Sequence, residues 1–322
     1  MPLPLQPPIE PQLARGKPEL PVGEQWAYER KYDGFRALAF VDGDLQMLQS
    51  RGSKPLERYF PELRFPAGRY VLDGEIVIAS DGAVEGEPED FDALSQRIHP
   101  AASRIALLSE QTPARYVAFD LLALDDEVLM TSPFAERRRL LEQFAELSLL
   151  PDITLAPVVA TAAEAEPWLR ETEGVVAKDL TAAYTPGKRT AMVKIKRSRT
   201  LDAVVAGYRP GKDEGTVGSL ILGLYDPGGE LRIVGHCSGI KPAEKRALRE
   251  RLAAYETGTR GQGDPSRWKN EKELEWIELR PELVIEVSFD QSSGGRIRHG
   301  TKLLRWREDK PPRECTLDQM QA

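Results

Sequence analysis

The sequence Lys31-Tyr32-Asp33-Gly34-Phe35-Arg36 places charged residues and one glycine between two short apolar segments. Those segments, residues 26–30 and 37–41, have the length of β-strands, and Asp-Gly after an apolar run favours a turn. We therefore expect two strands joined by a charged connection that carries Lys31. The lysine also has a chemical interpretation, because its amine can attack a phosphorus atom if nearby cations or burial keep part of it unprotonated near pH 7.

Strand-like segments alternate with polar turns up to residue 196, and one helix interrupts them. Ser132 and Pro133 provide a cap and a first position for a helix at residues 134–147, whose apolar positions fall on one face. This pattern predicts a fold that contains both strands and helices. The further strand-like segments are residues 70–79, 115–122, 174–178 and 192–196.

The pattern changes after a polar linker at residues 197–201. From residue 202 onward, short strands recur with glycine-rich turns, and one helix is expected at residues 242–255. This combination suits a small barrel of the OB type, a fold that often binds nucleic acid. We expect three parts: a proline-rich segment (1–22), a first domain (23–197) and a barrel domain (198–322).

Composition excludes several classes of protein. With 322 residues, of which 41% are hydrophobic, the chain is long enough for two domains with their own cores. Two cysteines and three widely separated histidines do not have the spacing of a structural zinc site. No stretch approaches 18 apolar residues, so we expect a cytoplasmic protein without a membrane partner.

Basic residues are clustered although the net charge is -7. Residues 188–199 contain six basic residues and no acidic one, and residues 296–313 contain seven basic residues and two acidic ones. Affinity for phosphates depends on where positive charges lie rather than on their sum, so the second half is the better surface for nucleic acid. A single charge run is more commonly a solvated face.

Three residues outside the first turn are suited to binding a nucleotide. Arg51 follows the first hairpin, where its guanidinium could hold phosphate oxygens with two hydrogen bonds. Glu75 lies in an apolar strand, a costly place for a carboxylate unless it binds a hydroxyl, a metal or a cation. Phe119 offers a plane for a base. Each also has an ordinary interpretation, as a surface arginine, an edge-strand acid and a core phenylalanine.

Two later strands alternate charged and apolar residues. Glu173 and Lys178 fall on opposite faces of the first, whereas Lys194 and Lys196 share one face of the second. Two lysines on one face repel each other unless an anion lies between them, and a triphosphate is a natural anion. Solvent would serve equally well if that face were exposed.

In this order the motifs resemble the ATP-dependent DNA ligases, within the superfamily that also contains RNA ligases and mRNA-capping guanylyltransferases. The resemblance implies an α+β fold: a nucleotidyltransferase (adenylation) domain with antiparallel sheets and flanking helices, followed by an OB-fold β-barrel. It rests on K-x-D-G-x-R at Lys31 to Arg36, Ser50-Arg51-Gly52, Leu72-Asp73-Gly74-Glu75, Phe119-Asp120-Leu121-Leu122, Glu173 to Lys178, Met192 to Lys196, and R-x-D-K at Arg307 to Lys310.

By this resemblance Lys31 is the nucleophile that becomes linked to AMP, and Glu29 binds the adenine amino group. Phe119 would stack on adenine, while Arg36 and Arg51 would hold the ribose and the phosphates.

The resemblance also implies ATP as the AMP donor and Mg²⁺ or Mn²⁺ as cofactor. Glu75 would bind ribose and metal, Glu173 would bind metal, and Lys194 and Lys196 would contact the α-phosphate. Three residues of the last motif would orient the departing pyrophosphate in the first step only: Arg307, Asp309 and Lys310.

The implied reaction has three steps: adenylylation of Lys31, transfer of AMP to a 5′-phosphate at a nick, and attack by the 3′-hydroxyl. The implied partner is nicked or broken double-stranded DNA, and the linker at residues 197–201 is the predicted hinge. Only 30 residues precede Lys31, so the chain resembles short two-domain bacterial ligases of repair and end joining. We expect a monomer that relies on a repair polymerase or an end-binding protein.

Two alternatives share these motifs. An RNA ligase or a capping enzyme would use the same lysine chemistry, although the R-W-R-E-D-K ending favours DNA. A non-catalytic nucleic-acid adaptor on a degenerate ligase fold would have no need of Lys31, Glu75 and Glu173 together. Met192, where many relatives carry tryptophan, alters packing without altering charge.

Overall fold

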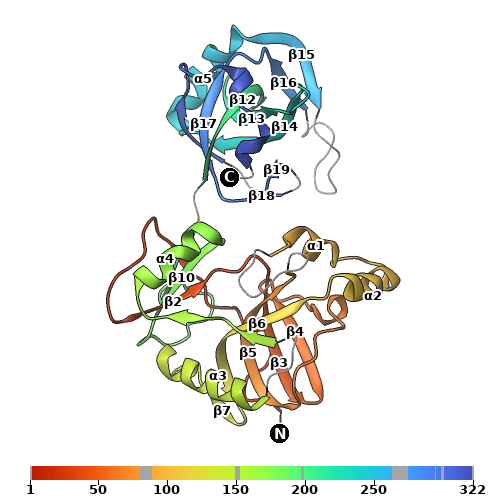
Figure 1. Cartoon of the computed structure of the whole chain (residues 1–322), viewed down its shortest axis with the longest axis vertical. Coiled ribbons are helices and arrows are strands. Elements are labelled where there is room, and N and C mark those ends of the chain that lie inside the picture. Colours follow the sequence, from red (N-terminus) through yellow and green to blue (C-terminus); the bar gives the residue numbers. More distant parts are fainter. Residues whose placement is uncertain are drawn as a thin grey trace. The chain divides into compact units, whose positions relative to one another are not determined.

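The computed structural model describes residues 2–79, 89–148, 153–196, 199–262, 275–293, 295–298 and 301–320. The chain forms two compact units, Met1–Arg197 (unit 1) and Ser198–Ala322 (unit 2), each with its own buried core (Figure 1). Among the described residues, no helix has the length and apolar character needed to span a bilayer.

The first sheet of unit 1 carries the connection that contains Lys31. Its strand order is β1-β11-β10-β2-β9, and neighbours are antiparallel except for β1, which runs parallel to β11. The predicted strands at residues 26–30, 174–178 and 192–196 are confirmed. The bounds are β1 Arg15–Gly16, β2 Trp26–Arg30, β9 Val158–Val159, β10 Gly174–Asp179 and β11 Met192–Lys196.

The second sheet of unit 1 has the order β4-β3-β5-β6-β7, with β8 parallel to β6. Apolar residues on one of its faces form the largest core cluster of this unit, which includes Leu72, Tyr116 and Leu121. The bounds are β3 Phe35–Gly43, β4 Leu45–Ser50, β5 Gly68–Val77, β6 Arg115–Leu124, β7 Glu127–Val128 and β8 Ile153–Leu155.

Helices pack beside these sheets. The predicted helix at residues 134–147 is confirmed as α3 (Phe134–Ser148), which buried Arg137 anchors to β6 through an ion pair of 2.7 Å with Asp120. A capping box of Thr161 and Glu164 begins α4 (Ala162–Glu171). Two further helices are α1 (Phe91–Gln96) and α2 (Ala102–Gln111), and neither these two nor α4 was predicted individually.

Unit 2 is a closed five-stranded barrel. Strand β12 pairs with both β13 and β17, and the pairings β13–β14, β14–β20 and β20–β17 complete the ring. This arrangement confirms the OB-fold expectation. The bounds are β12 Arg199–Pro210, β13 Val217–Tyr225, β14 Leu231–Gly239, α5 Lys245–Ala253, β15 Glu256–Gln262, β16 Glu275–Leu279, β17 Val284–Phe289, β18 Ser292–Ser293, β19 Arg296–Ile297 and β20 Thr301–Trp306.

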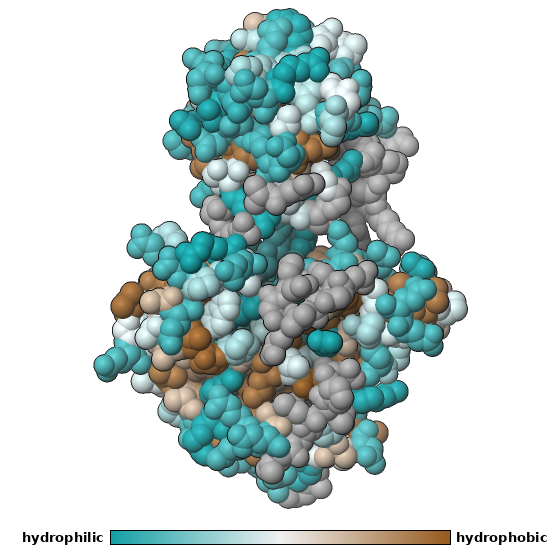
Figure 2. All heavy atoms as spheres, viewed as in Figure 1, coloured by the Kyte–Doolittle hydropathy of each residue, from teal (hydrophilic) through white to brown (hydrophobic). Residues whose placement is uncertain are grey.

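Apolar strand positions of unit 2 point into the barrel, and Leu248 and Leu252 of α5 join the same core. Hydrophilic residues accordingly cover most of the face of this unit in Figure 2. The sequence pattern missed β15, β16 and β20, because their exposed polar residues hide the alternation expected of a strand.

Two segments differ from their predicted status. The proline-rich segment packs on unit 1, where Leu3 and Gln12 are buried. The predicted linker at residues 197–201 is too long, because Arg199 already pairs with Phe289 at the start of β12 and Leu201 is buried in the barrel core. Residues 197–198 lie outside the described ranges.

Candidate functional site

A cavity of about 200 Å³ lies in unit 1. Seven of the twelve predicted site residues line it: Glu29, Lys31, Arg36, Arg51, Glu75, Phe119 and Lys194. Glu173 and Lys196 are not among the described residues of its wall. Ten other residues of the described part of the chain also line it: Pro11, Gln12, Leu13, Ala14, Arg30, Tyr32, Val176, Lys178, Arg189 and Met192. Residues from both sheets and from the N-terminal segment therefore surround one space.

Lys31 follows β2 directly and faces the cavity. Its Nζ lies 3.0 Å from Oε2 of Glu173, and its backbone N–H donates to the carbonyl of Gly174 at 2.9 Å. Gly174 has a φ of +133°, and a Cβ there would lie 2.1 Å from a backbone oxygen of β11. A Cβ at Gly34 would lie 2.2 Å from a backbone oxygen of β5. Both glycines therefore allow the close backbone approach that fixes Lys31.

Positive charge is concentrated beside Lys31. Burial lowers the pKa of Lys194, and the neighbouring charges of Lys196, Lys31, Arg51 and Arg189 lower it further. Removing a proton from such a cluster, or binding an anion in it, reduces the mutual repulsion. The cluster therefore suits a polyphosphate, and the shared face predicted for Lys194 and Lys196 gives it two of its charges.

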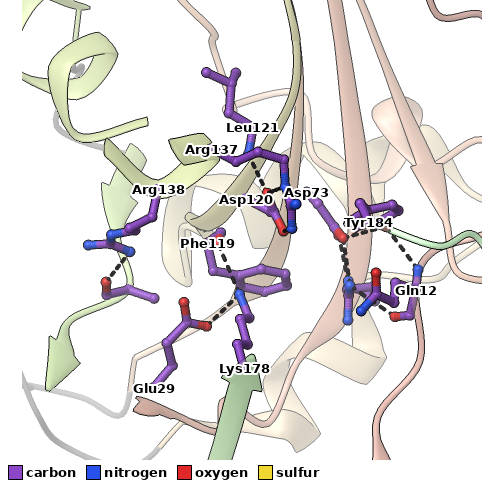
Figure 3. A network of polar contacts seen from close by, with 12 residues as sticks. Gln12, Glu29, Asp73, Phe119, Asp120, Leu121, Arg137, Arg138, Lys178 and Tyr184 are labelled. Carbon is purple, nitrogen blue, oxygen red and sulfur yellow. Dashed lines mark hydrogen bonds and ion pairs between the residues drawn. The ribbon is translucent and has the colours of Figure 1, made fainter. Parts of the chain in front are cut away.

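Glu29 brings a buried negative charge to the same cavity, where it pairs with Lys178. Lys178 contacts Oε2 of Glu29 at 2.7 Å and donates to the carbonyl of Phe119 at 2.9 Å (Figure 3). Burial raises the pKa of Glu29 and lowers the pKa of Lys178, and each partner opposes the shift of the other. Oε1 of Glu29 is buried and has no hydrogen-bond partner among the residues that the structure describes. A ligand N–H donor in the cavity would satisfy this oxygen.

Phe119 is 8% exposed and lies between charged groups. The guanidinium carbon of Arg36 lies 4.6 Å from its ring centroid, and Nζ of Lys178 lies 4.5 Å from it. Phe119 therefore lines the cavity as expected, and two cations already contact its ring. Val176 of β10 adds a second apolar surface to the wall.

Glu75 and Glu173 are the predicted metal ligands. Burial raises the pKa of Glu75 to about 7, although Arg36 and Lys31 lower it. The described residues include no group of three or more His, Cys, Asp or Glu side chains that could hold a metal ion. Mg²⁺ commonly binds one or two carboxylates, substrate phosphates and water, so this pair beside a phosphate-binding cluster fits such an ion.

The last predicted residues lie in unit 2. Arg307 pairs with Asp202 at 2.8 Å and with Asp309 at 2.8 Å, and its guanidinium lowers the pKa of Asp309 to about 2. Lys310 lies 3.4 Å from Glu314. These residues do not line the cavity of unit 1.

Sequence patterns missed several residues of the cavity wall. Lys178 was assigned a strand face but no partner, and Gln12 and Arg189 were assigned no role. The buried lysine had a detectable signal, because it ends the apolar segment Val175-Val176-Ala177, where a charge requires a partner. Gln12 had none, since its contacts with Tyr184 and Thr185 join residues more than 170 positions apart along the chain.

Two family models match the chain. Residues 18–196 match the ATP dependent DNA ligase domain, and residues 213–310 match the ATP dependent DNA ligase C terminal region. The first match covers more than half of the chain.

Similar proteins agree with these matches. DNA ligase C1 of Mycolicibacterium smegmatis is 44% identical, over 99% of this chain and 96% of the relative. The multifunctional non-homologous end joining DNA repair protein LigD of Mycobacterium tuberculosis is 32% identical, over 91% of this chain and 38% of the relative. A solved structure of mycobacterial DNA ligase D, complexed with ATP and MES, is 28% identical with a TM-score of 0.53, over 96% of this chain and 98% of that chain.

Proposed function

This chain belongs to the family of ATP-dependent DNA ligases, and we propose that it joins a 3′-hydroxyl to a 5′-phosphate in duplex DNA through AMP carried on Lys31. The observation that carries the assignment of the nucleophile is that Lys31 lines the same cavity as Glu29 and as Lys194 of the cationic cluster. The cationic residues around Lys194 suit phosphates, and the acceptor oxygen of Glu29 suits a base that carries an N–H donor.

In the first step, Nζ of Lys31 attacks the α-phosphorus of ATP. A P–N bond forms, the bond from the α-phosphorus to the bridging oxygen breaks, and pyrophosphate leaves. Lys194 and Lys196 stabilise the charge on the α-phosphate, and Arg36 and Arg51 hold the ribose and the phosphates. Lys31 has to leave Glu173 and lose a proton before it attacks, because only the free amine is a nucleophile.

Adenine recognition falls to Glu29 and Phe119. The free Oε1 of Glu29 accepts a hydrogen bond from the exocyclic amino group, which supports the choice of adenine over guanine, whose corresponding atom is an oxygen acceptor. Phe119 supplies an aromatic surface for the base.

Glu75 and Glu173 would hold the divalent ion, Mg²⁺ or Mn²⁺. The bound ion would polarise phosphate oxygens and neutralise part of their charge. Glu173 contacts Lys31 at 3.0 Å, so an ion bound to this carboxylate would compete with the lysine for it.

In the second step AMP passes from Lys31 to the 5′-phosphate of a DNA break, and in the third the 3′-hydroxyl displaces AMP. We place this activity in repair or end joining in the cytoplasm, in a monomer assisted by a repair polymerase or an end-binding protein. The similarity to LigD, which is named for end joining and DNA repair, supports the assignment to repair or end joining. The matches to DNA ligases favour this function over an RNA ligase, a capping enzyme or an adaptor.

The test is to incubate the protein with α-labelled ATP and Mn²⁺, remove free nucleotide, and then add a nicked DNA duplex. We expect a covalent label that is released as AMP while the nick is sealed. A label that RNA nicks discharge and DNA nicks do not would contradict the proposal. Absence of any label on freshly purified, AMP-free protein would favour the adaptor.

The R-x-D-K segment gives a prediction specific to the first step. Arg307→Gln should slow labelling of Lys31 by about 100-fold, the usual cost of removing one preorganised charge donor. Sealing of a nick that already carries 5′-AMP should change less than about threefold, because no pyrophosphate leaves in that step. Single-turnover rates of the two reactions measure the difference.

Arg305→Gln is the matched control, since Arg305 lies two positions earlier and forms an exposed ion pair with Glu286. Equal losses in both reactions for Arg307→Gln would contradict a role confined to the first step.

A further inference from the structure

The N-terminal segment forms part of the nucleotide cavity. Four of its residues, Pro11 to Ala14, line the wall, and β1 runs parallel to β11. The backbone N–H of Leu13 donates to the carbonyl of Lys188 at 2.8 Å, and that of Lys17 donates to Lys194 at 3.1 Å. The segment is therefore fixed at two places to the chain that carries the cationic cluster.

Gln12 connects this segment to the loop before β11. Its side chain is buried, and its Oε1 accepts a hydrogen bond of 2.6 Å from the backbone N–H of Thr185. Its own backbone N–H donates to the hydroxyl of Tyr184 at 2.9 Å (Figure 3). Both contacts join residues that the sequence separates by more than 170 positions.

The hydroxyl of Tyr184 also donates a hydrogen bond to Asp73. Because the hydroxyl accepts from Gln12, its single proton is free to donate to Oδ2 of Asp73, at 2.7 Å. Burial and the Asp73 carboxylate both raise the pKa of Tyr184, so the donor keeps its proton. Asp73 is fully buried on β5.

Asp73 in turn holds Arg36 with two hydrogen bonds, 2.5 Å to Nε and 2.6 Å to Nη2. Nη2 of Arg36 also donates to the carbonyl of Gln12 at 3.4 Å. The four residues Gln12, Tyr184, Asp73 and Arg36 thus form a closed cycle of hydrogen bonds. The guanidinium of Arg36 is the member that lies against Phe119 in the cavity.

We propose that Gln12 and Tyr184 are positioning residues that fix the Arg36 guanidinium in the orientation needed to bind ATP. The inference rests on the nucleotide role proposed for Arg36. The two hydrogen bonds to Asp73 fix the Arg36 guanidinium relative to that carboxylate, and the contacts with Tyr184 and Gln12 also fix the pair relative to the surrounding chain. Part of the ordering is therefore complete before ATP arrives, which lowers the entropy cost of binding.

The hydroxyl of Tyr184 can be removed without removing its packing, because the ring is buried against Leu38, Phe40 and Leu122. In Tyr184→Phe, Asp73 loses one of its three donors and Gln12 loses the acceptor of its N–H. We expect affinity for α,β-methylene ATP, which cannot release pyrophosphate, to fall by about tenfold. We also expect the KM for ATP in self-adenylylation to rise about tenfold, with the maximal rate changed less than about twofold.

The matched control is Tyr70→Phe. Tyr70 is also buried in unit 1, and its hydroxyl donates to a backbone carbonyl, that of Pro66, away from the cavity. It should lose stability without losing affinity for the analogue. Equal affinities for the two variants would overturn the inference.

If Tyr184→Phe does not fold, Gln12→Met provides the second test, because methionine has a similar shape but cannot accept from Thr185. Its control is Gln46→Met, since the Gln46 side chain bonds the backbone of Leu63 and Phe65 outside the cavity. A tenfold loss of affinity only in Gln12→Met supports the inference, and equal affinities overturn it. Failure here leaves wild-type labelling and DNA sealing unaffected, so the two proposals are tested separately.

Discussion

Replacing Lys31 with alanine is expected to abolish covalent labelling by α-labelled ATP, a loss of at least about 10⁴-fold, the scale seen when an enzyme loses its nucleophile. No other amine can form the phosphoramidate at this position. Lys31→Arg should be equally inactive, because a guanidinium can keep the ion pair with Glu173 but does not lose its proton near neutral pH. Gel detection of the labelled protein after denaturation measures both.

The Lys31 variants should keep one activity that can be measured, the sealing of a nick that already carries AMP. A nick that already carries 5′-AMP bypasses the first two steps, so Lys31→Ala should seal it within about tenfold of the wild-type rate if only the nucleophile is lost. Lys54→Ala, at an exposed turn of unit 1, is the control for lysine removal and should label normally. A labelled Lys31→Ala would contradict the assignment of the nucleophile and move it to another lysine of the cavity.

The sequence predicted the residues of the cavity better than it predicted their partners. Motif order brought Glu29, Lys31 and Glu75 into one hypothesis, and the structure places all three around one cavity. Their roles stay predictions. Strand periodicity assigns a residue to a face, as it did for Lys178, but the residue opposite depends on which strands become neighbours. The pairing of β10 with β2, which brings Lys178 to Glu29, is a tertiary outcome.

Local sequence patterns predicted the fold with the same limitation, because they do not encode contacts between distant segments. Continuous apolar segments such as β6 were predicted closely, because burial on both faces leaves a clear signal. The N-terminal segment gave no such signal. Its prolines marked it only as a separate segment, whereas Pro11 to Ala14 line the cavity and Gln12 is buried. Single hydrogen bonds to distant backbone decide this outcome, and no local pattern encodes them.

The largest stability effect is expected from Lys178→Met. Lys178 and Glu29 are 3% and 2% exposed, and removing the cation leaves the Glu29 carboxylate buried without its ion pair. Breaking one side of a buried pair usually costs about 3–5 kcal/mol. Urea unfolding at pH 8 should show this loss. Arg170→Met, which breaks the exposed pair with Glu166, should cost less than about 1 kcal/mol.

The double variant Glu29→Gln/Lys178→Met separates lost charge from lost packing. With both charges removed, most of the stability should return, since a neutral buried pair carries no uncompensated charge. Affinity for ATP should not return, because the carboxylate proposed to accept the adenine amino group has become an amide.

The pH dependence of Lys178→Met gives the sharpest test of this account. Burial raises the pKa of Glu29, and Lys178 is the group that most opposes the rise, so the variant should have a higher Glu29 pKa than the wild type. A folded-state pKa above the unfolded value gives stability that is present at low pH and is lost as the pH rises through the folded value. The deficit of Lys178→Met should therefore be smaller at pH 5 than at pH 8. An equal deficit at both values would mean that Lys178 stabilises unit 1 through contacts other than its ion pair with Glu29, such as those of its ammonium group with the Phe119 and Phe134 rings.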